Sequence, residues 1–196
     1  PRIADLLVDS PVVFLEAPGG YGKSTTARQL AATLDRPLVR AVLPDGGADL
    51  TALLTVLGQA CRRAGLPSMA DVMDPDDPDG TLERLGARLA SSEGLVLLVD
   101  DVQRSGATAA EWLARLAGGI PPQVRLVLAG RRLDRVLSGL VDRIDAVALD
   151  ARALRMDQAE IAAVLAGAAT GDVAPDRVAA LADATDGWPA AVSLAA

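Results

Sequence analysis

The sequence predicts an α/β fold, a three-layer sandwich of about five parallel strands between helices, followed by a small helical subdomain. Short apolar runs rich in Val and Leu recur through the first 150 residues, with helical stretches between them. After Leu149 the strand pattern stops and only helical stretches follow. The first pattern is typical of βαβ units, whose parallel sheet is buried on both faces. We therefore expect two domains, residues 1–150 and a helical subdomain at residues 151–196.

The expected elements follow from the same patterns. The strands predicted from the apolar runs are residues 12–17, 37–43, 94–100, 124–129 and 144–149. The helices expected between them are residues 23–34, 49–64, 80–90, 108–116 and a short one near 133–140. Residues 68–80, where acidic residues crowd around two prolines, are expected to form a solvated loop. Helices at 157–166, at 175–184 and from residue 189 onward are expected in the subdomain, where Asp157 followed by Glu160 resembles a capping box.

Composition excludes several kinds of chemistry. The 196 residues include no histidine, so Ser-His-Asp and Cys-His nucleophile systems and most zinc sites are excluded. The single cysteine, Cys61, lies in an apolar helical pattern and is expected to be a small buried hydrophobe. Any chemistry must therefore use carboxylates, Lys, Arg and a hard metal ion.

Charge and hydropathy restrict the partners. The net charge of −7 argues against this segment gripping a nucleic-acid backbone, which favours clustered Lys and Arg. No apolar run approaches the roughly 18 to 20 uncharged residues of a membrane-spanning helix, and residues 1–5 lack signal-peptide features. We expect a cytoplasmic protein without membrane contact. The absent initiator Met and an end within a helical pattern indicate part of a larger protein, with the subdomain truncated.

A glycine-rich segment, Ala17 to Thr25 (APGGYGKST), lies where the first expected strand ends and the first helix begins. A phosphate-binding loop requires that context, because glycines let backbone N–H groups turn inward toward phosphate oxygens at a helix N-terminus. Lys23 would reach the β- and γ-phosphates, and the Ser24 hydroxyl would ligate Mg²⁺. The candidate nucleotide-binding residues of this loop are Pro18, Gly19, Gly20, Tyr21, Gly22, Lys23, Ser24 and Thr25.

The loop departs from the general pattern G-x-x-x-x-G-K-S/T at one position, where this chain has Ala17 instead of glycine. Alanine is the smallest substitute, so the loop can form if that position does not need a positive φ. The alternative is an ordinary glycine-rich turn between strand and helix. Tyr21 is expected to be a packing residue.

A second signature, GLVLLVDD, is a buried strand that ends in two carboxylates. Ligands of open α/β sheets bind at the edge formed by the carboxyl ends of the strands, where these two carboxylates would lie. The segment matches the Walker B strand of a P-loop NTPase fold. Asp100 would bind Mg²⁺, either directly or through water, and Asp101 would polarise the attacking water as a catalytic residue beside Lys23. After the fourth strand, Arg131 is a candidate γ-phosphate sensor, with a solvated surface Arg as the alternative, and Arg132 is expected at the surface.

Together, APGGYGKST, LVLLVDDVQ, LVLAGRR and DGWPAAVSLAA resemble the STAND class of signalling NTPases over essentially the whole chain. Within it, they are most similar to the ATP-binding module of large LuxR-type (MalT-like) and related multidomain transcriptional regulators of bacteria. In that family the loop commonly reads A-P-A-G-Y-G-K-T/S-T, with alanine at the position of Ala17, so Gly19 is a small departure. The Walker B strand of the family continues D-D-x-H, whereas this chain has Gln103.

The resemblance also assigns residues outside the loop. A G-x-P element of the family is matched by Gly187-Trp188-Pro189, which implies that Pro189 packs against adenine in the closed, nucleotide-bound form. Pro1-Arg2 resembles the arginine-containing N-terminal segment of the family, which lies near the base.

The resemblance implies a regulatory switch. ATP or ADP with Mg²⁺ would bind between the sheet and a helical lid, and slow hydrolysis would reset the active closed state. Sensor and effector domains would flank this module in the same polypeptide, and nucleotide-dependent self-association is open. A small-molecule kinase or other phosphotransferase that uses the same loop is an alternative, and so is a nonhydrolytic nucleotide-binding scaffold.

Overall fold

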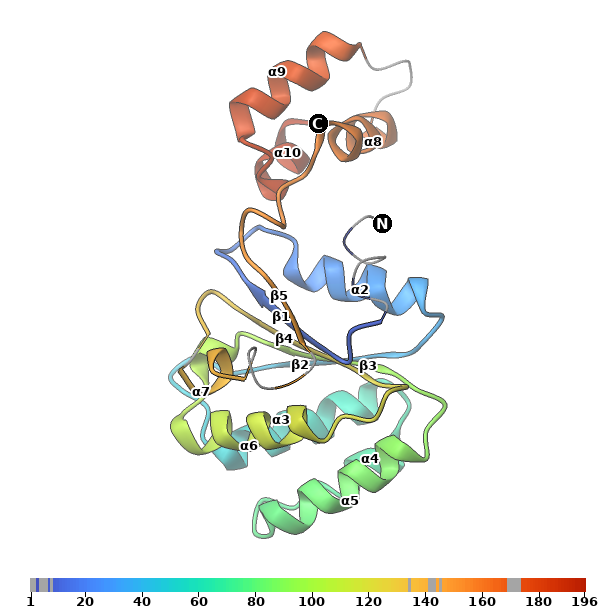
Figure 1. The fold of residues 1–196 in the computed structure, drawn as a ribbon, viewed down its shortest axis with the longest axis vertical. Helices are drawn as coiled ribbons and strands as arrows, with labels where there is room; N and C mark the ends of the chain where they lie inside the picture. Colours follow the sequence, from blue (N-terminus) through green and yellow to red (C-terminus); the bar gives the residue numbers. More distant parts are fainter. Residues whose placement is uncertain are drawn as a thin grey trace.

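The computed structural model describes residues 3, 7, 9–133, 135–140, 144, 146–168 and 174–196. A parallel sheet of five strands runs through its centre in the order β2-β3-β4-β1-β5 (Figure 1). The strands are β1 (Val12–Glu16), β2 (Leu38–Val42), β3 (Val96–Asp100), β4 (Arg125–Gly130) and β5 (Ala146–Leu149). The central strands β3 and β4 are buried along their full length, which is why they appear in the sequence as continuous apolar runs. The predicted α/β fold and its five strands are confirmed.

Helices cover both faces of the sheet (Figure 1). On one face lies α2 (Lys23–Thr33), whose Ala27 and Leu30 pack in a core with Val13 and Val127. The other face carries α3 (Leu50–Arg63), α4 (Pro67–Ala70), α5 (Pro78–Ala90), α6 (Ala107–Gly118) and α7 (Arg135–Ser138). Because crossovers between parallel strands are right-handed, the direction in which the chain moves across the sheet decides which face the connecting helix covers. The chain travels from β1 to the edge strand β2 and then back through β3 and β4, so the helices change face after β2.

The strand order places β1 inside the sheet, one strand from the edge. β1 pairs with β4 on one side and β5 on the other. The chain leaves β1 for the far edge strand β2 and later returns past β1 to form β5. Such a reversal opens a crevice beyond the carboxyl ends of the strands, where open α/β sheets bind ligands.

In the described residues, the sheet is followed by the helices α8 (Gln158–Ala168), α9 (Pro175–Thr185) and α10 (Pro189–Ala195). They enclose a small core of their own, formed by Ile161, Leu165, Val178 and Val192. Figure 1 shows them beyond α2, on the same side of the sheet as that helix. The expected capping box is present, because Asp157 N donates to Glu160 Oε2 at 3.1 Å and Glu160 N donates to Asp157 Oδ1 at 2.9 Å.

The prediction of an open loop at residues 68–80 was partly wrong. Helix α4 covers the first part of the segment, and α5 begins at Pro78. Both helices carry a proline in their first turn, where its missing N–H leaves no hydrogen bond unmade. Asp77 caps α5 by accepting a 3.0 Å hydrogen bond from Gly80 N. Pro78, one of the two prolines of the predicted loop, therefore begins a helix instead of breaking one.

In the parts of the chain that the structure describes, no helix is both long enough and apolar enough to cross a membrane.

Candidate nucleotide-binding site

The loop between β1 and α2 turns at two glycines. Gly20 has φ 80° and Gly22 has φ 77°, a left-handed conformation that side chains with a Cβ rarely adopt. Ala17 is not among the residues with positive φ, and its N–H continues the sheet by donating to Gly130 O at 3.1 Å. The condition for alanine at this position is therefore met. Ala17 is buried in the core under α2, where a methyl group packs well.

Lys23, the first residue of α2, folds back over this loop. Its Nζ donates to Ala17 O at 2.7 Å and to Pro18 O at 3.0 Å. Burial lowers the pKa of the Lys23 ammonium group, the charge of Arg131 lowers it further, and Asp100 and Asp101 oppose this effect. Lys23 is also the only lysine of the sequence. The ammonium group of Lys23 is thus held at the loop by two carbonyl groups, which the oxygen atoms of a bound anion can replace.

Ser24 and Asp100 meet directly, although 76 residues separate them in the chain. The Ser24 hydroxyl donates to Asp100 Oδ2 at 2.6 Å, and Asp101 N donates to Asp100 Oδ1 at 3.1 Å. Asp100 is only 6% exposed. The Ser24 hydroxyl and the Asp100 carboxylate thus lie next to each other beside the loop, and oxygen ligands of this kind suit Mg²⁺. The residues present therefore fit the metal that the sequence implied.

Arg40, which sequence reasoning missed, also reaches Asp100. Its Nη2 lies 3.0 Å from Asp100 Oδ2. Arg40 lies on the edge strand β2, where its side chain interrupts an otherwise apolar strand, LVRAV. That single charged residue within a strand was the only sequence signal for it.

Asp101 follows β3 in a left-handed conformation, φ 60° and ψ 38°, which Asp tolerates better than most residues. Two donors hold its carboxylate. Gln103 Nε2 donates to Asp101 Oδ1 at 2.9 Å, and Arg104 Nη1 lies 3.3 Å from Asp101 Oδ2. Gln103 Oε1 in turn accepts from Arg131 N at 2.9 Å. Gln103 therefore occupies the position of the expected His and connects the ends of β3 and β4.

A cavity of about 220 Å³ opens above these groups. It is lined by residues 19–25, Asp100, Asp101 and Arg131. Pockets for whole drug-sized ligands span roughly 300 to 1,000 Å³. The cavity therefore suits the phosphate end of a nucleotide. It gathers most of the predicted site residues, but Pro18 and Pro189 do not line it, and Arg132 is exposed outside it.

The helical subdomain sits directly on the loop. Ala190 N, in the first turn of α10, donates to Gly20 O at 3.0 Å. The rings of Tyr21 and Trp188 lie 6.4 Å apart with a tilt of 32°. Pro189, between Trp188 and Ala190, is the first residue of α10 and lies beside the loop. Pro1 and Arg2, also assigned from the resemblance, lie outside the described residues.

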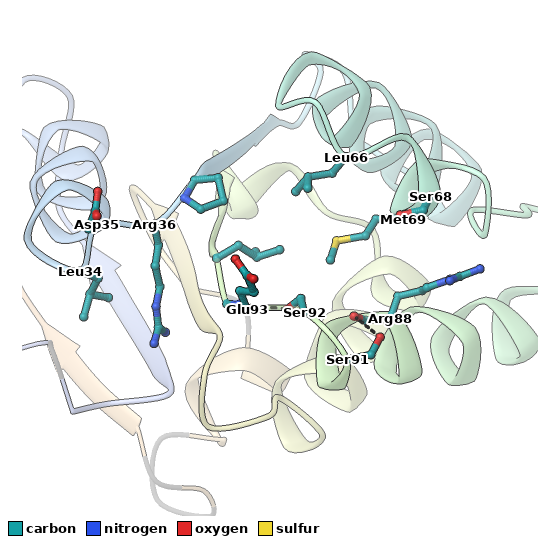
Figure 2. Close-up of a pocket in the computed structure, with 13 residues that line it drawn as sticks. Leu34, Asp35, Arg36, Leu66, Ser68, Met69, Arg88, Ser91, Ser92 and Glu93 are labelled. Carbon is teal, nitrogen blue, oxygen red and sulfur yellow. Dashed lines mark hydrogen bonds between the residues drawn. The ribbon is translucent and has the colours of Figure 1, made fainter.

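A larger cavity, about 650 Å³, lies at the opposite edge of the sheet. Figure 2 shows its lining, which comes from the end of α2, from α4, from α5 and from the turn before β3. Its residues Pro37 and Leu95 precede β2 and β3, so it faces the amino ends of these strands. Ligands of open α/β sheets bind at the carboxyl ends. The smaller cavity is therefore the one that matches the fold, despite its size.

A glycine-turned loop, one lysine and a hydroxyl–carboxylate pair at the carboxyl edge of a parallel sheet define a P-loop NTPase site. Residues 9–137 match the family model described as an AAA domain, and the chain belongs to that family. It is an AAA-type P-loop ATPase domain. Among the curated proteins compared with it by sequence, none matches.

Solved structures share the fold. A STAND protein with a tetratricopeptide repeat sensor from Pyrococcus horikoshii superposes with a TM-score of 0.64 at 12% identity, over 96% of this chain and 28% of that chain. The Drosophila ORC structure bound to GC-rich DNA and Cdc6 gives 0.53 at 13% identity, over 86% of this chain and 61% of that chain. A mutant of RuvB from Thermotoga maritima gives 0.55 at 18% identity, over 98% of this chain and 57% of that chain. The chain thus spans less than two thirds of each of these proteins.

Proposed function

We propose that this chain is an ATP- and ADP-binding switch module in which residues 151–196 act as a lid over the phosphate loop of residues 1–150. The observation that carries the proposal is the 3.0 Å hydrogen bond from Ala190 N to Gly20 O. Gly20 also lines the phosphate cavity, so a ligand in the cavity touches the residue that holds the lid. A switch requires a ligand that favours one arrangement, because equal affinity for both would shift nothing.

The residues of the cavity suit distinct roles in binding. Lys23 would exchange its two loop carbonyls for phosphate oxygens, and the backbone N–H groups at Gly20 and Gly22 would bind the same anion. Ser24 and Asp100 would hold Mg²⁺, which when bound supplies positive charge opposite the phosphates. Pro189 would approach the base from the lid. The contacts of Lys23 and the Ser24–Asp100 pair support this arrangement.

Slow hydrolysis is part of the proposal. Asp101 would orient water, and Arg131, which lines the cavity, would contact the γ-phosphate. The Asp101 carboxylate is already engaged by Gln103 and Arg104, so fewer of its lone pairs are available to accept a proton from water. We expect turnover well below the roughly 1 to 1,000 per second of typical enzymes.

The finer assignment is that the module belongs to a multidomain bacterial transcriptional regulator of LuxR type. Its support is the sequence resemblance and the fold shared with a STAND protein, 28% of which this chain covers. Sensor and effector domains would flank the module, and any DNA contact would lie outside this acidic segment. A cytoplasmic location goes with that role.

The test is nucleotide binding by calorimetry with Mg²⁺, comparing the wild type with Lys23→Ala. We expect ADP and ATP to bind the wild type, and the variant to bind roughly 10- to 100-fold more weakly, because a charge-assisted hydrogen bond to phosphate is lost. Arg63→Ala, at an exposed position of α3, is the matched control for loss of one positive charge. Well-folded wild-type protein that binds no adenine nucleotide would refute the proposal, and rapid steady-state turnover would refute its switch character.

Because Lys23 is the only lysine, amine acylation reports on the loop itself. Mass spectrometry of the peptide that carries Lys23 should show acetylation in the free protein and protection with ADP and Mg²⁺. Equal acetylation with and without saturating nucleotide would mean that the nucleotide binds elsewhere.

A further inference from the structure

Arg40 and Ser24 share one oxygen of Asp100. The Ser24 hydroxyl donates to Asp100 Oδ2 at 2.6 Å, and Arg40 Nη2 donates to the same atom at 3.0 Å. We propose that Arg40 is an internal counter-ion that competes with Mg²⁺ for Asp100 and so lowers the metal affinity of the site. This role rests on the proposed nucleotide-binding function, which supplies the Mg²⁺ site.

The fold brings these two residues together across neighbouring strands. In the parallel pairing of β2 with β3, Val42 is opposite Asp100, and Arg40 is opposite Leu98. Side chains two residues apart on a strand share a face. Leu98 lies in the core under α2, so the Arg40 and Asp100 side chains are both on the face that carries Ser24.

Asp100 needs a positive partner when no metal is bound. Its side chain is only 9% exposed, and a buried carboxylate without a counter-charge is strongly unfavourable. Lys23 is nearby, but its ammonium group donates to Ala17 O and Pro18 O. Among the described residues, Arg40 is the only cation within ion-pair distance of Asp100.

The same geometry makes Arg40 a competitor for the metal. Each carboxylate oxygen offers about two lone pairs, and Ser24 and Arg40 both donate to Oδ2. A dication bound between Ser24 and Asp100 would need that oxygen and would lie next to a guanidinium of like charge. The Arg40 side chain is 49% exposed on an edge strand, so it can turn into solvent. Metal binding is then an exchange of Arg40 for Mg²⁺.

The exchange stabilises the metal-free state of the site. Once Mg²⁺ leaves, Arg40 returns to Asp100, and no buried charge is left unpaired. The protein would therefore hold ADP without metal. The measurable consequence is that Mg²⁺ improves ADP affinity only slightly in the wild type.

The experiment is calorimetric titration of ADP in EDTA and in excess Mg²⁺. The ratio of the two dissociation constants, EDTA over Mg²⁺, is compared between variants. Arg40→Met removes the charge, and we expect the ratio to rise about fivefold or more. Arg40→Lys keeps the charge and should stay within about twofold of the wild type. An unchanged or smaller ratio in Arg40→Met would overturn the proposal, because Arg40 would then only orient Asp100.

Arg62→Met is the matched control. Arg62 lies on α3, across the sheet from this site, where it pairs with Asp71 on the surface at 3.6 Å. Its loss changes the net charge by the same amount, and the ratio should not change. A rise as large as that of Arg40→Met would mean that general charge explains the effect, and would equally overturn the role of Arg40.

Thermal unfolding supplies a second readout. In EDTA, Arg40→Met should unfold at a lower temperature than the wild type. Adding ADP with Mg²⁺ should then raise the Tm of Arg40→Met by more than it raises the Tm of the wild type. If Arg40→Met does not fold, Arg40→Gln retains a hydrogen-bond donor without charge and should show the same increase in ratio. Failure of the wild type to bind ADP in either buffer would refute the proposed function as well. Normal ADP binding with an unchanged ratio in the variants would refute only the role of Arg40.

Discussion

Gln103 donates its side-chain amide to Asp101 Oδ1 over 2.9 Å. The other end of the same amide accepts the N–H of Arg131, also at 2.9 Å. An amide can serve both neighbours at once because it carries donors and an acceptor, and it stays neutral at every pH. The chain thus replaces the expected histidine with a residue that connects the two loops without titrating.

The first prediction concerns this link. Gln103→Ala should lower the single-turnover rate of ATP hydrolysis about tenfold, because the Asp101 carboxylate, then held by Arg104 without Gln103, positions water less well. We expect this loss to outweigh the effect of the lone pair that the change frees. The dissociation constant for ADP should stay within about twofold. Rapid-quench measurement of phosphate release and calorimetry separate the two effects. A parallel loss of rate and ADP affinity would instead indicate a collapsed loop.

The second prediction concerns the contact between Gly20 of the phosphate loop and Ala190 of the proposed lid. A Cβ at Gly20 would lie 2.7 Å from the Cβ of Ala190, whereas a Cβ at Gly22 meets nothing within 4 Å. Both glycines have positive φ, so alanine strains the backbone by about 1 to 2 kcal/mol at either site. Only Gly20→Ala should displace α10. Hydrogen exchange of the Ala190 amide should accelerate about tenfold in that variant and little in Gly22→Ala. Equal acceleration in both would show that loop strain alone moves the lid.

The third prediction separates two neighbouring arginines. Arg131 lines the phosphate cavity and Arg132 does not, although both are exposed. Arg131→Ala should weaken ATP binding roughly 10-fold more than ADP binding, because a charge-assisted contact with the γ-phosphate is lost. Arg132→Ala should leave both affinities unchanged. Competition binding with the two nucleotides measures the difference, and equal effects on ATP and ADP would exclude a γ-phosphate contact.

The fourth prediction concerns pH. Burial raises the pKa of the Cys61 thiol from 9.0 to about 11. The unfolded chain releases this proton at lower pH than the folded protein, so stability is lost as pH rises between about 9 and 11. By pH 10 the loss is about 1.4 kcal/mol. The free energy of unfolding in urea is compared between the wild type and Cys61→Ala at pH 8 and at pH 10. The comparison isolates the contribution of Cys61, because the opposite contribution of Lys23 is present in both proteins. The prediction is contradicted if the difference in unfolding free energy between the two proteins is the same at pH 8 and pH 10.

Local patterns in the sequence sufficed for most of the elements. Apolar runs located every strand, and the loop from Ala17 to Thr25 located the phosphate cavity, because strand, turn and helix signals depend on neighbouring residues. The same local logic predicted the Asp157–Glu160 cap. It failed at Pro78, where the position of a proline within the first turn decides whether it starts or breaks a helix.

What the sequence could not predict depends on pairing between distant segments. The contact of Arg40 with Asp100 requires β2 to lie beside β3, and the contact of Ala190 with Gly20 joins residues 170 positions apart. Strand order is a property of the whole sheet, and a parallel register cannot be read from one strand. The role of Gln103 is visible only once β4 brings Arg131 to it.

The connection between the sheet and the proposed lid would determine how a movement spreads. Leu15 and Leu149 are register partners, so the strand that leads into the phosphate loop and the strand that leads toward the lid end side by side. Leu154 is then anchored in the core under α2, while Met156 N already bonds to Gly187 O within the lid at 2.9 Å. In the proposed switch, the lid would therefore pivot at the residues around Arg155. Turning about so short a hinge displaces the near end of the lid least and α9, which lies farthest from the sheet in Figure 1, most. In the proposed switch, a small shift at the phosphates would be amplified by this lever arm at α9, where a flanking domain of the proposed regulator would respond to it.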